Sequence, residues 1–149
     1  MPGIVPNEGE LRLLAELMDG ATARENWLLK LMRTAVTPAE TDTAASYTEA
    51  NFTNYAAKTL NRSVGGANWS TPASGAPTGG WSAEAAVAES TYGGGTPQSW
   101  TCGATGNTIY GYWYEGATSG KVLLAEQFAT PRTLALNDVL NFTPRFGLS

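Results

Sequence analysis

Carboxylates are the side chains of this sequence that could most readily do chemistry. A pair of them can act as general acid and general base, as in the hydrolysis of glycosidic bonds. The candidates are Glu25, Asp42, Glu49, Glu84, Glu115, Glu126 and Asp138. Their spacing singles out no pair, and a chain of 149 residues has little material for the wide cleft that such a pair needs. We therefore interpret them as solvated surface carboxylates or turn caps.

The other common catalytic side chains are scarce. The chain has no His and one Cys, Cys102, so it cannot form a His-based acid and base pair, a His/Cys zinc site or an internal disulfide. Calcium-loop, phosphate-loop and nucleophile-elbow motifs are also absent from the sequence. We expect no catalytic residue, no cofactor and no metal, and hence no enzyme. Cys102 is expected to be a compact, half-buried hydrophobic residue.

Composition argues against two classes of partner. Nine Lys and Arg residues are outnumbered by thirteen Asp and Glu residues, and a phosphate-binding surface normally carries a basic face. No apolar run approaches the roughly 20 residues that span a bilayer, and the first residues do not resemble a secretory signal. We expect a soluble protein made in a cytoplasm that binds neither nucleic acid nor membrane. Charged residues are only 15% of the chain, which suits a surface that lies against partners.

Aromatic residues form a conspicuous row near residue 110. Tyr110, Tyr112 and Tyr114 would share one face of a strand, and Ile109, Gly111 and Trp113 the other. An exposed row could stack on sugar rings, which makes a glycan-binding module one alternative function. The interpretation that we favour is core packing or subunit contact, because one face of a sheet must pack on another and aromatic residues are common at protein interfaces.

The first 20 residues predict an arm followed by a helix. Pro2, Gly3 and Pro6 leave Ile4 and Val5 on an extended arm, which packs either on its own domain or on a neighbour. Asn7 is the predicted N-cap, with Glu10 completing a capping box. Gly20 ends the helix. Its apolar stripe is Leu11, Leu14, Ala15 and Met18, widened by Leu13 and Leu17, and we expect the stripe to dock on the edge of the domain or on another subunit.

Residues 21–149 are expected to form a single domain built from strands. Residues 26–32 alternate as a strand, residues 37–43 are a loop, and residues 55–62 form a short strand. Residues 65–80 are predicted as loop because they offer few apolar side chains. A strand of small residues follows from Trp81 to Glu89, although this segment also suits a helix, and residues 92–97 form a loop.

The C-terminal third predicts a hairpin and a final strand. Residues 108–115 and 121–128 are joined by a Gly-containing connection at 116–120, and Pro131 should block extension of the second strand. Residues 139–146 form the last strand, and Pro144 suggests that its end lies at a sheet edge. Short strands separated by turns, after one helix, predict a mainly β fold: an antiparallel β-sandwich, of which a jelly roll is one form.

Several segments resemble a family of small virion proteins of tailed bacteriophages. The segments are residues 1–10, 108–114, 117–121 and 128–144, which touch both ends of the chain, whereas residues 63–100 match nothing in it. They carry no catalytic signature. The resemblance implies a structural protein of the capsid, of the cement or decoration type, that binds the outer surface of the major capsid protein shell in the virion.

A cement protein gains strength from many symmetric copies of modest contacts. We expect a homo-oligomer, with a trimer preferred because capsid lattices offer three-fold positions. The residues expected at contacts with neighbouring copies or the shell are Ile4, Val5, Leu11, Leu14, Met18, Tyr112 and Tyr114. A helix that merely plugs its own sandwich is the alternative for the N-terminal contacts, and a head-completion or tail-adaptor protein is the alternative within the virion.

Overall fold

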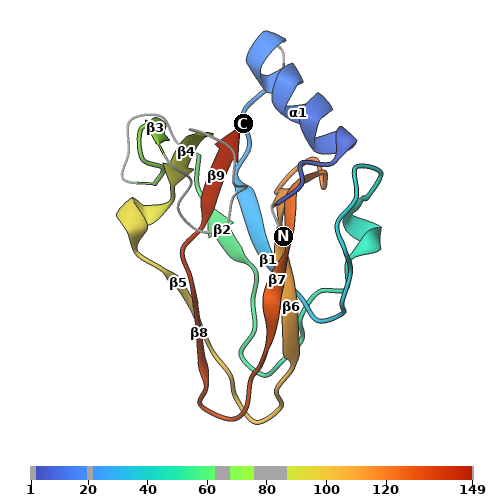
Figure 1. Ribbon diagram of the computed structural model, residues 1–149, viewed down its shortest axis with the longest axis vertical. Helices are drawn as coiled ribbons and strands as arrows, with labels where there is room; N and C mark the ends of the chain where they lie inside the picture. The colour runs from blue at the N-terminus through green and yellow to red at the C-terminus, as the bar shows by residue number, and fades with distance from the viewer. Residues whose placement is uncertain (1–2, 20–21, 63–67, 76–86, 149) are drawn as a thin grey trace.

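The computed structural model describes residues 3–19, 22–62, 68–75 and 87–148 (Figure 1). Within them the chain is mainly β, with one α-helix near the N-terminus, as predicted. The helical elements are α1 (Asn7–Met18) and the 3-10 turns η1 (Ala44–Ser46) and η2 (Gly93–Gly95). The strands are β1 (Trp27–Met32), β2 (Lys58–Leu60), β3 (Ala73–Gly75), β4 (Val87–Thr91), β5 (Gln98–Thr101), β6 (Thr108–Gly116), β7 (Val122–Thr133), β8 (Val139–Phe142) and β9 (Arg145–Leu148).

Every strand pairing among these elements is antiparallel, which confirms the predicted type of sheet. The largest sheet has the order β2-β1-β6-β7, a second has the order β3-β4-β9, and β5 pairs with β8. The predicted hairpin is β6–β7, and it supplies the centre and one edge of the four-stranded sheet. Figure 1 shows α1 at one end of the molecule, beyond the ends of the strands.

The main core lies between the four-stranded sheet and the two smaller ones. Leu29 and Leu31 of β1 pack in one cluster with Trp100 of β5 and Leu140 of β8, and all four are at most 5% exposed. Such burial of both inner faces is the arrangement of a β-sandwich. A second cluster on the outer face of the four-stranded sheet joins Met32, Tyr47, Trp113, Val122 and Ala125. Strand β6 is therefore covered on both faces.

A β-bulge changes which side chains of β6 share a face. The register with β7 shifts between Ile109 and Gly111, so Ile109 joins Tyr112 and Tyr114 in the main core. Tyr110 remains half-exposed. The prediction that Tyr110, Tyr112 and Tyr114 form one row opposite Ile109 is therefore wrong, because the irregular pairing between Ile109 and Gly111 breaks the two-residue period.

The two predictions based on proline have different outcomes, and the one for Pro131 is wrong. Strand β7 continues past Pro131 to Thr133, because β7 is an edge strand and Pro131 lies where the register with β6 is interrupted. The prediction that Pro144 lies at a sheet edge is confirmed, because β8 belongs to a two-stranded sheet and β9 is the outer strand of the β3-β4-β9 sheet. The Pro144 ring is buried, and its carbonyl accepts a hydrogen bond from Tyr92 N. It divides the predicted last strand into β8 and β9.

The Gly-rich middle of the chain differs partly from expectation. Residues 73–75, predicted as loop, form β3 and pair with β4. The predicted strand from Trp81 begins among residues outside the described ones, and its described part is β4. Strand β5 was not predicted at all. Cys102 is 1% exposed, so it is a small hydrophobic residue as expected, but it is fully buried instead of half-buried.

Candidate interaction surface

Helix α1 begins one residue earlier than its sequence suggests. Pro6 is the N-cap residue, and its carbonyl accepts hydrogen bonds from the N–H groups of Gly9 and Glu10. Asn7 lies inside the helix and no side chain caps it, so the predicted capping box of Asn7 and Glu10 does not form. Proline at this boundary starts the helix by fixing φ, without any side-chain hydrogen bond.

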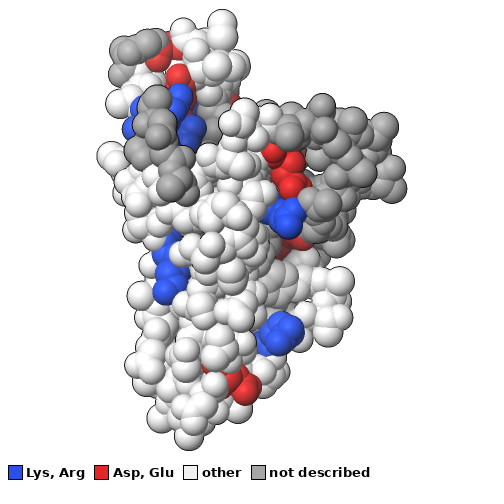
Figure 2. All heavy atoms as spheres, turned by 90° about the vertical axis from the view of Figure 1, so that its left-hand side faces the viewer, with Lys and Arg blue, Asp and Glu red and all other residues white. Residues whose placement is uncertain are grey.

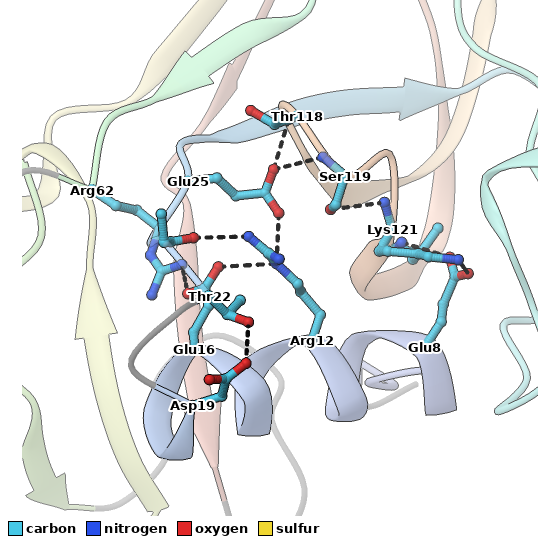
Figure 3. A network of polar contacts seen from close by, with 12 residues as sticks. Glu8, Arg12, Glu16, Asp19, Thr22, Glu25, Arg62, Thr118, Ser119 and Lys121 are labelled. Carbon is cyan, nitrogen blue, oxygen red and sulfur yellow. Dashed lines mark hydrogen bonds and ion pairs between the residues drawn. The ribbon is translucent and has the colours of Figure 1, made fainter.

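The side of α1 that faces the domain is polar. Glu8, Arg12 and Glu16 recur every four residues, which places them on one face of a helix. Glu8 accepts a hydrogen bond from Val122 N at 2.8 Å and pairs with Lys121. Arg12 Nε lies 3.2 Å from Glu16, which in turn pairs with Arg62 (Figure 3). These contacts fasten α1 to the β6–β7 turn and to the chain that follows β2.

Glu25 is the centre of this polar cluster. It is 7% exposed, and its Oε2 accepts hydrogen bonds from the N–H groups of Thr118 and Ser119 at 2.6 and 2.8 Å. Its Oε1 lies 2.9 Å from Arg12 Nε. Burial alone would raise the pKa of Glu25, but the hydrogen bonds from Ser119 and Thr118 and the charge of Arg12 outweigh it and lower that pKa. The carboxylate is thus held ionised, which fixes Arg12 and with it the helix.

Close backbone contact reinforces the polar contacts. Gly9 is buried, and a Cβ atom at this position would lie 2.4 Å from the carbonyl oxygen of Val122. Leu13 is the apolar side chain of α1 that packs against the main core. The helix can approach β7 this closely only because residue 9 has no side chain.

The opposite side of α1 exposes its large apolar residues. The exposed fractions are 70% for Leu11, 57% for Leu14, 79% for Leu17 and 75% for Met18. The apolar stripe was predicted to dock on the edge of the domain or on another subunit. In the structure it points away from the domain. A soluble domain normally turns such a stripe inward, so this outward face has the character of a contact surface for another molecule.

The other residues predicted at interfaces lie elsewhere. Ile4 pairs with Ala125 of β7 through two hydrogen bonds of 2.8 Å, and Val5 packs against the core, so the arm lies on its own domain. This was one of the two alternatives for the arm. Tyr112 and Tyr114 are 3% and 0% exposed. Their prediction as interface residues is wrong, because the two sheets enclose them.

The carboxylates considered for catalysis have structural partners. Asp42 and Asp138 each accept a backbone N–H three residues away, which caps a turn. Glu49 and Glu115 both pair with Lys30. Glu84 lies outside the described residues.

Among the residues that the structure describes, no three His, Cys, Asp or Glu side chains cluster as metal ligands, and no helix has the length and hydrophobicity to cross a membrane.

Charge is sparse on the face of the molecule that Figure 2 shows. Figure 2 shows Lys, Arg, Asp and Glu atoms in small separate groups on a face that is otherwise uncharged. No basic or acidic patch dominates this view. Such a surface provides little electrostatic steering, so the recognition it supports depends on shape and apolar contact.

Comparison with known proteins does not assign a family. A scan against protein-family models and a search of curated proteins found no match for this chain.

Proposed function

We propose that this chain is a capsid cement protein of a tailed bacteriophage, which binds the outer surface of the major capsid protein shell and stabilises the head. The observation that carries the proposal is the outward apolar face of α1, formed by Leu11, Leu14, Leu17 and Met18. The resemblance of the sequence to small phage virion proteins gives the class of partner.

The way in which α1 is held supports a docking role. Its polar side is fixed by Glu8, Arg12 and Glu16, so the apolar side is presented without a large loss of conformational freedom on binding. A 12-residue helix would not be stable alone in water. The β domain therefore holds α1 in one orientation, and the apolar face of α1 is available to contact the shell or a neighbouring copy.

Symmetric repetition increases the total binding strength that such a small apolar patch can provide. A shell offers many identical positions, and a trimer placed over a three-fold position would present three helices at once. We propose a homotrimer bound in many copies to the virion, assembled in the host cytoplasm. No cofactor, nucleic acid or membrane is needed for this role.

The test is binding of the purified protein to phage heads that lack it. Sedimentation of the heads separates bound from free protein, and cryo-electron microscopy shows the position of the bound copies. The decisive variant replaces Leu11, Leu14 and Leu17 with Gln. If these side chains are buried on binding, each contributes about 1.5 kcal/mol or more, and the affinity falls by about a thousandfold or more. Leu136→Gln is the matched control, because Leu136 is 62% exposed but lies on the loop between β7 and β8.

The copy number separates this role from its alternative within the virion. Copies spread over the whole shell support a cement protein. A ring of about six to twelve copies at one vertex would identify a head-completion or adaptor protein instead. A strictly monomeric protein that ignores such heads, or that binds them equally well with the triple substitution, would overturn the proposal.

A further inference from the structure

A small pocket opens where the β7 edge of the four-stranded sheet meets β8 and β9. It encloses about 260 Å³, and none of its lining residues belongs to α1. Strand β7 supplies one side and the chain from β8 into β9 the other. The lining residues are Tyr112, Glu126, Phe128, Asn141, Phe142, Thr143 and Arg145.

Three aromatic rings form the apolar part of this pocket. The ring of Tyr112 lies 4.2 Å from that of Phe142 and 5.9 Å from that of Phe128, measured between centroids. Tyr112 is buried and forms the base, whereas Phe128 and Phe142 are half-buried and so have ring surface that a ligand can cover. Flat apolar surface of this kind packs against the C–H groups of a ring-shaped ligand.

Polar groups surround the rings. Glu126 accepts a hydrogen bond of 2.6 Å from the Tyr112 hydroxyl, which fixes its carboxylate at the pocket. Asn141 is exposed and offers an amide, and Thr143 offers a hydroxyl. Arg145 lines the pocket while its guanidinium lies 2.9 Å from Glu89. The lining thus contains hydrogen-bond donors and acceptors, with one carboxylate and one guanidinium of opposite charge.

We propose that this pocket binds a neutral saccharide, with one sugar ring packed on Phe128 and Phe142 and its hydroxyls bonded to Glu126 and Asn141. A sugar hydroxyl both donates and accepts, so it can donate to the carboxylate and accept from the amide. A carboxylate fixed in advance loses little conformational freedom on binding. The guanidinium of Arg145 already pairs with Glu89, and burial raises the pKa of Glu126 and so disfavours its charge. Neither group therefore favours a charged ligand over an uncharged one.

This inference differs from the sugar-stacking row considered from the sequence. That row required exposed Tyr112 and Tyr114, and both are enclosed in the core. The pocket instead uses Phe128 and Phe142, on strands that approach each other only in the folded domain. It is also independent of capsid binding, which is proposed for α1.

The experiment is titration of the ¹⁵N- and ¹³C-labelled full chain, followed by NMR, with the methyl glycosides of glucose, galactose, mannose and N-acetylglucosamine. Tetramethylammonium and acetate are titrated in parallel as a cation and an anion. We expect at least one glycoside to shift the Phe128 and Phe142 ring signals and the Asn141 side-chain amide in a saturable way. Neither ion should do so.

Matched substitutions locate the binding. Asn141→Ala and Phe142→Leu should each weaken the affinity at least about tenfold, the effect of about 1.4 kcal/mol. Asn61→Ala and Phe146→Leu are the controls, because Asn61 is also exposed, Phe146 is also half-buried, and neither lines the pocket. Thermal unfolding shows whether each variant is folded.

Three outcomes would overturn the saccharide site. One is the absence of a saturable shift with any of the four glycosides. Another is binding that Asn141→Ala and Phe142→Leu leave unchanged in folded protein. The third is a shift caused by tetramethylammonium or acetate alone, which would assign the pocket to a charged ligand. Binding to phage heads is measured separately, so failure here leaves the role of α1 unaffected.

Discussion

The Tyr114 hydroxyl bridges both backbone polar groups of Arg145. It donates to the carbonyl oxygen at 2.8 Å and accepts from the N–H at 3.0 Å. Tyr114 lies in the centre of the four-stranded sheet and Arg145 begins β9 in the opposite sheet. One buried side chain therefore ties the two layers together where Pro144 interrupts the final strand. Burial is the main reason that the pKa of Tyr114 is raised well above its usual range.

Tyr114→Phe should destabilise the domain by about 1–3 kcal/mol, because it leaves two partly buried backbone groups of Arg145 without their partner. Chemical denaturation followed by Trp fluorescence measures this loss. Tyr110→Phe is the control, since Tyr110 lies on the same strand but is half-exposed. Equal stabilities for the two variants would contradict the bridging role of the Tyr114 hydroxyl.

A strand could be predicted from the sequence where apolar and polar side chains alternate regularly along it. Strand β1 alternates as expected, with Trp27, Leu29 and Leu31 all buried. On β6 the alternation correctly separated Tyr112 and Tyr114 from Trp113. It failed at Ile109 and Tyr110, because the irregular pairing there is decided by β7 and leaves no local signal in the sequence of β6. The covering of Trp113 by Tyr47, 66 residues earlier in the chain, is likewise a tertiary contact.

Arg12→Ala should loosen α1 and destabilise the protein by about 2–3 kcal/mol, because it leaves the largely buried carboxylates of Glu16 and Glu25 without their shared cation. Amide hydrogen exchange should show faster exchange in α1 than in β1. Lys121→Ala removes an exposed ion pair and should cost no more than about 1 kcal/mol. Unchanged exchange in α1 of the Arg12 variant would show that the polar contacts do not hold the helix.

Gly9→Ala should destabilise the protein by about 1–3 kcal/mol, because the added Cβ collides with the Val122 carbonyl and forces α1 outward. The direction is informative, since the same change in a solvent-facing helix stabilises by about 1 kcal/mol. Thermal or urea unfolding provides the measurement. Asn7→Ala should change stability by less than about 0.5 kcal/mol, because Asn7 is exposed and caps nothing. A stabilising Gly9→Ala would mean that α1 does not lie on β7 in solution.

The orientation of α1 illustrates why the candidate surface was only partly predictable. The sequence identified the apolar stripe of Leu11, Leu14 and Met18 but placed it toward the domain as readily as toward a partner. A polar stripe competes with it for the side of α1 that faces the domain. This stripe consists of Glu8, Arg12 and Glu16, and Gly9 lies beside it. Only the positions of Glu25 and Val122 show that the polar stripe is the one that docks, because they supply its partners from distant parts of the chain.

Acid should release α1 before it unfolds the β domain. The pKa of Glu25 is lowered in the folded protein, so its contribution to stability is present above the unfolded value of about 4.3 and is lost as the pH falls through the folded one. Amide exchange in α1, compared with that in β6, should therefore accelerate as the pH is lowered from 5 to 3, after correction for intrinsic rates. In Glu25→Gln this pH dependence should be weaker. Equal pH dependence in both proteins would assign the effect to another carboxylate.

Glu126 should show the opposite pH dependence. Burial is the main cause of its raised pKa, partly offset by the hydrogen bond from Tyr112, so the folded protein favours the protonated carboxyl group. Its contribution to stability is present below the unfolded pKa and is lost as the pH rises through the folded one. Glu126→Gln keeps an oxygen to accept the Tyr112 hydroxyl and carries no charge. The variant should therefore be more stable than the wild type at pH 7 and no more stable below about pH 4, where both side chains are neutral. Urea unfolding at the two pH values measures the difference, and a variant that is less stable at pH 7 would mean that a cationic partner holds Glu126 ionised in the folded protein.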